Sequence, residues 1–155
     1  MITKWTQLIL AAATMLAVCV FSSVTSHAQA VAAPPSGGGM WSGVYTAAQA
    51  ARGAAAAAKS CASCHGPDLN GGEAGPALVG LDFLGNWNNQ TLSDLFDRIH
   101  GTMPADAPGS LSLQDTADII AQILHLNNVP AGQTELPTDL NALGKIKIEG
   151  TAPAK

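Results

Sequence analysis

The segment Cys61-Ala62-Ser63-Cys64-His65 places two thiols three positions apart and an imidazole directly after the second. On one helical turn, both sulfur atoms can reach the two vinyl groups of a porphyrin and form thioethers, while the adjacent imidazole points at the iron. This spacing is the attachment pattern of c-type haem. We therefore predict one covalently bound haem c per chain, with Cys61 and Cys64 as the thioether residues and His65 as an axial ligand of the iron.

Two other uses of this cysteine pair are a dithiol redox centre and half of a zinc site. A structural zinc site normally needs a second pair of ligands. The only other cysteine is Cys19, and none follows Cys64. The pattern therefore favours haem attachment.

The N-terminal region has the features of a secretory signal peptide. Lys4 supplies a positive charge, residues 8–21 are apolar, and polar residues and small residues follow. Cleavage after Ala28 fits this pattern, and cleavage after Ala30 fits almost as well. We predict a signal peptide over residues 1–28 and a periplasmic mature protein.

A retained membrane anchor and a lipoprotein are the alternatives for this region. The apolar run of about 14 residues is shorter than the roughly 20 that a membrane-spanning helix needs. A lipoprotein would be cut before Cys19, but Val18 stands where a small residue is expected. Both features favour a cleaved signal and no stable membrane insertion.

Cleavage would leave 127 of the 155 residues, enough for one modest domain. Both remaining cysteines are used by haem, so no disulfide is expected. Loss of Lys4 leaves six basic and eleven acidic side chains, a net charge of −5. This acidic balance argues against nucleic acid and anionic lipid as partners.

The mature sequence predicts three main helices joined by long loops. Residues 29–40 are rich in Ala, Pro, Ser and Gly and predict a flexible leader. A capping box at Thr46 and Gln49 predicts a first helix that runs into the cysteine motif. Residues 66–90 predict a long loop that packs against the haem.

The second helix is predicted over residues 92–100, capped by Thr91 and Asp94 and ending at Gly101. The third begins after Ser112 and stops at Asn127, with its apolar stripe formed by Ile119, Ile120, Ile123, Leu124 and Leu126. His125 falls opposite this stripe, near Asp118 and Ala121, and is predicted to be a surface histidine. Residues 131–155 predict a tail packed along the domain with a frayed end.

The second axial ligand has four candidates in the domain: Met40, His100, Met103 and His125. Met103 is favoured because Gly101-Thr102-Met103-Pro104 predicts an ordered turn that can present a thioether to the haem face opposite His65. Met40 lies in a glycine-rich stretch and is predicted to pack on the surface. Ligation by His100 and an open coordination site remain alternatives.

The chain resembles the class I c-type cytochromes over residues 41–130. The resemblance is carried, in family order, by Cys61-Ala62-Ser63-Cys64-His65, Gly75-Pro76-Ala77-Leu78, Trp87 and Thr102-Met103-Pro104. Within this family, the chain most resembles the haem domains associated with quinoprotein (PQQ-dependent) alcohol dehydrogenases. The stretches Trp41 to Thr46 and Met103 to Ser112 carry this narrower resemblance. The resemblance implies the all-α cytochrome c fold around one haem.

The resemblance also assigns roles to individual residues. The Pro76 carbonyl would accept a hydrogen bond from the His65 ring, Leu78 would pack on the haem, and Trp87 would lie near a haem propionate. Gly53 matches the small residue at which the first and last helices cross. The family usually has aromatic residues where this chain has Ala57 and Gln122, which predicts a looser crossing covered by the tail or by another subunit.

These features together predict a periplasmic one-electron carrier without catalytic residues of its own. The resemblance implies a quinoprotein dehydrogenase as donor and an oxidase or another cytochrome as acceptor. One alternative is a haem subunit bound tightly in a dehydrogenase complex. The other is a haem enzyme or gas sensor with a labile distal site.

Overall fold

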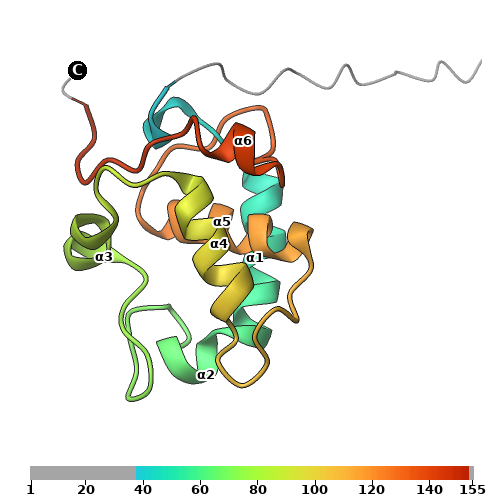
Figure 1. The fold of residues 1–155 in the computed structure, drawn as a ribbon. Helices are drawn as coiled ribbons and strands as arrows, with labels where there is room; N and C mark the ends of the chain where they lie inside the picture. Colours follow the sequence, from blue (N-terminus) through green and yellow to red (C-terminus); the bar gives the residue numbers. More distant parts are fainter. Residues whose placement is uncertain (1–37, 154–155) are drawn as a thin grey trace, which may run out of the picture. The chain divides into compact units, whose positions relative to one another are not determined.

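The computed structural model describes residues 38–153, and this part of the chain is helical (Figure 1). Its elements are the 3-10 helix η1 (Met40–Ser42) and the α-helices α1 (Ala47–Ser60), α2 (Ala62–His65), α3 (Gly80–Trp87), α4 (Leu92–Thr102), α5 (Leu113–Leu126) and α6 (Leu140–Leu143). The described residues form no β-strand beyond an isolated antiparallel bridge between Thr91 and Lys147. The all-α fold is therefore confirmed. The predicted signal peptide lies outside the described residues.

The three long helices α1, α4 and α5 are those that the sequence predicts, and each begins at a hydroxyl cap. The side chains of Thr46, Thr91 and Ser112 each accept a hydrogen bond from the backbone three residues on. Thr91 and Asp94 form a complete capping box. Helix α4 continues through Gly101 to Thr102, slightly beyond its predicted end.

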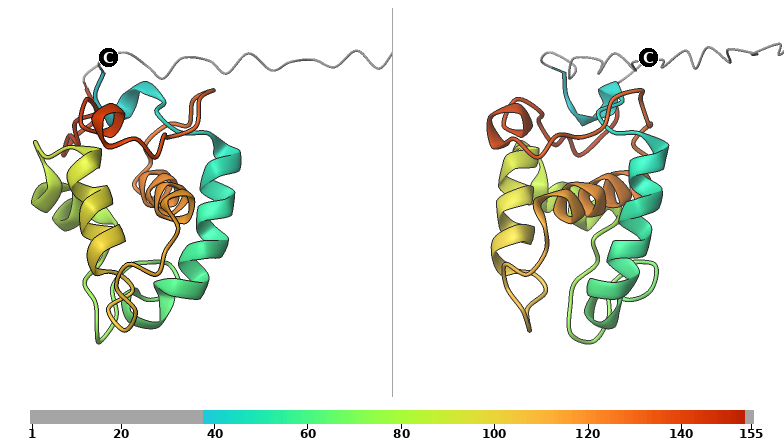
Figure 2. Two further views of the ribbon diagram at one scale, coloured as in Figure 1. Left: turned by 45° about the vertical axis from the view of Figure 1, so that its right-hand side comes forward. Right: turned by 90° about the vertical axis from the view of Figure 1, so that its right-hand side faces the viewer.

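Helix α5 lies between α1 and α4, and its contact with α1 is close (Figure 2). At the crossing, a Cβ atom added to Gly53 would overlap the carbonyl oxygen of Asp118, so only glycine fits there. Ala57 is also buried at 3% exposure. The predicted loose crossing is therefore wrong, because small side chains on α1 let the two backbones approach.

The face of α5 that carries Asp118 and Ala121 is buried against α1, although the sequence predicts a solvated face. His125 is exposed, as predicted. Arg52 of α1 donates to both carboxylate oxygens of Asp118, at 2.8 and 3.0 Å. It also bonds Glu135 at 2.9 Å. Burial raises the pKa of Asp118, but hydrogen bonds from Arg52 and Gln114 outweigh it and hold that pKa below its ordinary value.

The C-terminal tail packs into the core at two places. The Gln49 amide does not complete the predicted capping box; it bonds the backbone of Leu136 twice, at 3.0 and 2.7 Å. Leu143, Ile146 and Ile148 are buried. Met40 is fully buried and donates its N–H to the Lys147 carbonyl at 2.9 Å, so its predicted surface position, at the end of the expected leader, is wrong.

The predicted loop over residues 66–90 contains the helix α3. Sequence reasoning missed it because it includes Gly80 and Gly85, both poor helix formers, and its N-cap residue Val79 makes no side-chain cap. The first N–H of α3, that of Gly80, donates instead to the Asn127 side chain at 2.9 Å. A residue distant in sequence thus caps this helix.

Substitution Gly53→Ala tests the helix crossing. We expect it to lower the free energy of unfolding by roughly 1–3 kcal/mol, because the added methyl group forces α1 and α5 apart. Urea unfolding of the haem-loaded protein, followed by circular dichroism, measures the change. Gly85→Ala is the matched control, because no atom lies within 4 Å of its added Cβ; it should raise stability by up to about 1 kcal/mol. Equal stability of Gly53→Ala and the parent would contradict the close crossing.

Candidate functional site

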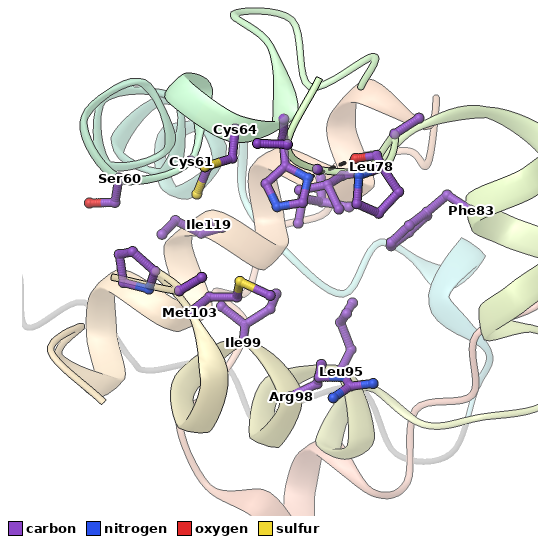
Figure 3. A pocket seen from close by; sticks show the side chains of 18 of the residues that line it. Ser60, Cys61, Cys64, Leu78, Phe83, Leu95, Arg98, Ile99, Met103 and Ile119 are labelled. Atoms are coloured by element: carbon purple, nitrogen blue, oxygen red, sulfur yellow. Dashed lines mark hydrogen bonds between the residues drawn. The ribbon is translucent and has the colours of Figure 1, made fainter. Parts of the chain in front are cut away.

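A cavity of about 800 Å³ lies among α1, α2, α3, α4 and α5 (Figure 3). It falls within the range of roughly 300–1,000 Å³ typical of cofactor sites. Most of its wall is apolar. The lining residues are Ser60, Cys61, Ser63, Cys64, His65, Ala74, Gly75, Pro76, Ala77, Leu78, Phe83, Asn86, Trp87, Leu95, Arg98, Ile99, Met103, Pro104, Ala105, Asp106, Ile119 and Ile123.

The cavity brings together all seven residues that the sequence proposes for the site. Cys61, Cys64 and His65 come from the α1–α2 junction, Pro76 and Leu78 from the following loop, Trp87 from the end of α3, and Met103 from the end of α4. The structure therefore places them around one space. Their roles toward a haem remain proposals.

The two thiols lie at the junction of α1 and α2. The Cys61 N–H donates to the Ala57 carbonyl at 2.8 Å, at the C-terminal end of α1. The Cys61 carbonyl accepts hydrogen bonds from the N–H groups of Cys64 and His65, at 3.1 and 2.9 Å. This turn puts both sulfur atoms and the imidazole at the cavity wall. The two cysteines are not joined by a disulfide. Burial, and secondarily the neighbouring Cys64, raises the pKa of the Cys61 thiol.

His65 is held by the loop that follows it. Its Nδ1 lies 2.7 Å from the Pro76 carbonyl oxygen, so Nδ1 carries the proton and donates. The other ring nitrogen, Nε2, is then the one with a free lone pair. Gly75 lets the loop approach the ring this closely, because an added Cβ atom at this position would lie only 2.8 Å from Nδ1. The result is a buried imidazole of fixed tautomer.

Met103 directly follows α4 and lies across the cavity from the cysteines (Figure 3). Its N–H donates to the Ile99 carbonyl at 2.9 Å, which fixes the backbone where the thioether enters the cavity. The other candidate ligands, Met40, His100 and His125, do not line the cavity. His100 packs on Phe96, with its Nδ1 3.5 Å from the Thr116 hydroxyl.

Several lining residues were not identified from the sequence. Phe83 and Trp87 have ring centroids 6.2 Å apart, and Phe83 belongs to the helix that was read as loop. Arg98 is the lining arginine, on the exposed side of α4. A charged residue on an amphipathic helix reads as ordinary surface, so no local signal marks it. The apolar stripe of α5 is predicted from the sequence, but the position of Ile119, and of Ile99 on α4, at a cavity is not.

The residues present fit a covalently attached haem. An apolar space of this size is lined by two cysteines, which could bond to the haem vinyl groups, and by one histidine and one methionine, which could be the axial ligands of its iron. Within residues 38–153, no group of three or more His, Cys, Asp or Glu is arranged to hold a metal ion directly. Among the same residues, no helix is both long and apolar enough to cross a bilayer.

Comparisons with known proteins agree with this chemistry. The family model described as cytochrome c oxidase, cbb3-type, subunit III matches residues 48–123. The crystal structure of the sulfane dehydrogenase SoxCD from Paracoccus pantotrophus contains a chain that is 28% identical and superposes with a TM-score of 0.52. That match covers 68% of this chain and 57% of the other. A search of curated proteins finds no match.

Replacing Cys61 and Cys64 together by Ala tests covalent attachment. The parent protein, produced with the haem-attachment machinery, should gain the mass of one haem and keep its colour after acid–acetone extraction. The double variant should be colourless after extraction and largely unfolded, because the small core lacks its central group. Ser63→Ala, between the two cysteines and exposed, is the control and should retain haem. Extractable haem in the parent would contradict thioether formation.

Proposed function

The chain belongs to the class I c-type cytochromes, which carry covalently attached haem c, and on this basis we propose that it is a periplasmic one-electron carrier with axial ligands His65 and Met103. The observation that carries the proposal is the position of the Met103 thioether in the cavity, across from the Cys61–His65 segment. A bound haem supplies a reversible one-electron couple at its iron.

The chain's own residues would hold both axial positions. The His65 imidazole is fixed by Pro76 at 2.7 Å, and the Met103 backbone is fixed by Ile99 at 2.9 Å. Two ligands that stay in place in both oxidation states leave little to rearrange when an electron moves. A methionine ligand also raises the reduction potential.

The rest of the wall would exclude water and neutralise charge. Leu78, Leu95 and Ile123 offer apolar surface to the porphyrin. Haem carries two propionates, and the groups of the cavity lining able to meet them include the Trp87 indole N–H and the Arg98 guanidinium. We assign these two residues to the propionates.

We propose the periplasm as location, because the signal-like residues 1–28 indicate export. The donor would be a quinoprotein dehydrogenase, as the narrower resemblance of residues 41–46 and 103–112 implies. The acceptor would be an oxidase or another cytochrome. The surface buried on docking with these partners would be small and the complex transient, as in other electron-transfer encounters.

A second candidate function is a haem subunit bound permanently in a redox complex. It is favoured by the matching family description, which names an oxidase subunit, and by the similarity to a chain of a dehydrogenase. Affinity purification of the tagged protein from the periplasm distinguishes the two. A free carrier should elute alone, whereas a bound subunit should bring a stoichiometric partner.

Stopped-flow mixing with a substrate-reduced quinoprotein alcohol dehydrogenase tests the donor. We expect rapid reduction of the haem, followed in its absorption bands, and no alcohol oxidation by this chain alone. If the partner's docking face is basic, the second-order rate should fall as salt rises, since this chain is acidic. Rapid reduction by a quinol-oxidising complex, with none by the dehydrogenase, would instead indicate a general respiratory shuttle.

Met103→Leu tests the distal ligand, with Met40→Leu as a matched control. Each substitution removes one thioether and conserves volume, but Met40 does not line the cavity. Met103→Leu should abolish the near-red thioether-to-ferric-iron band, lower the potential and admit carbon monoxide to the ferrous protein. Met40→Leu should leave all three unchanged. A parent protein that binds carbon monoxide rapidly would favour the gas-sensor or enzyme alternative.

A further inference from the structure

Asn127 is a buried polar residue at the C-terminal end of α5, with 5% of its surface exposed. Its amide nitrogen donates to the Leu78 carbonyl at 3.1 Å and to the Ile123 carbonyl at 2.8 Å. Its amide oxygen accepts from the Gly80 N–H at 2.9 Å. The side chain therefore joins α5 to a segment 47 to 49 positions earlier in the chain.

The joined segment is the one that holds His65. Pro76, whose carbonyl accepts from His65 Nδ1 at 2.7 Å, lies two residues before Leu78. Leu78 is further fixed by its N–H, which donates to the Leu69 carbonyl at 2.8 Å. Asn127 thus anchors this short segment from α5, in addition to the bond that Leu78 makes within the loop.

The same amide also sets where α3 begins. Gly80 is the first residue of α3, and the helix has no local side-chain cap. Its first N–H has no partner within the helix and takes the Asn127 side chain instead. Helix α3 contributes Phe83 and Trp87 to the cavity lining. The Asn127 side chain therefore positions both this helix and the loop segment before it.

We propose that Asn127 is a positioning residue for the His65 ligand, acting through the 76–80 segment to keep the Pro76 carbonyl against Nδ1. This inference rests on the proposed function, in which His65 binds haem iron. A strong Nδ1–H hydrogen bond makes Nε2 a better donor and so stabilises the ferric state. Loss of Asn127 should therefore weaken the bond and raise the reduction potential.

The test compares Asn127→Ala with Gln49→Ala in the haem-loaded protein. Gln49 is a matched control because it is also a buried amide that pins a distant backbone by two hydrogen bonds, at Leu136, yet it does not line the cavity. Both variants should lose stability. Only Asn127→Ala should show an upward shift of the potential and faster solvent exchange of the His65 ring N–H, observed by NMR.

Asn127→Ser is a milder second variant, in case the alanine variant does not fold. Its hydroxyl can still bond the Ile123 carbonyl four residues back, as Thr116 bonds Ser112 at 2.9 Å. It is too short to reach Leu78 and Gly80. It should therefore reproduce the shifts of the potential and of the ring N–H exchange, while the Met103 absorption band stays in place.

The outcomes separate this inference from the proposed function. A parent protein without bound haem, or without a His65 ring N–H signal typical of an iron ligand, would reject the proposed function. A normal parent, together with an unchanged potential and unchanged ring N–H exchange in both Asn127 variants, would reject only the positioning role. Equal shifts in Gln49→Ala would also reject it, because they would reflect general loosening of the fold.

Discussion

The close crossing of α1 and α5 is the constraint on which the site depends. Gly53 lets the two backbones meet at the Asp118 carbonyl, where no side chain would fit. One partner, α1, runs from this crossing to Cys61 at its end. The other, α5, carries Ile119 and Ile123 to the cavity wall and ends at Asn127. The packing of α1 against α5 thereby sets the position of the attachment motif relative to the opposite wall.

The cavity has a second role, because its lining is also part of the hydrophobic core. The space of about 800 Å³ is lined by side chains that would be core residues in a protein without a cofactor, such as Phe83, Leu95 and Ile99. A haem bound here would supply packing partners to this apolar lining. Attachment through two thioethers would keep that group in place. Attachment and folding are therefore parts of one problem for this chain.

The local parts of this structure were predictable from the sequence, and the long-range parts were not. Caps at Thr46, Thr91 and Ser112 and the apolar periodicity identified the three long helices. The residues proposed for the site all line one cavity. Helix α3 was missed because its stabilising contact, from Asn127, is tertiary. The role of Gln49 was missed for the same reason, since its amide fits a capping box equally well in sequence. Likewise, Asp118 reads as solvated surface until Arg52 is seen beside it.

The tail bears on how the protein is used. The absence of aromatic side chains at Ala57 and Gln122 suggested a crossing that needs cover from the tail or from another subunit. The crossing is in fact close, and the tail contributes beside it through Leu136 on Gln49 and Glu135 on Arg52. The chain itself therefore supplies the packing that a partner subunit was invoked to provide. The lack of the family's aromatic residues is thus compatible with a carrier that leaves its partners between electron transfers. Support for a bound-subunit role therefore comes from the comparisons and not from the helix crossing.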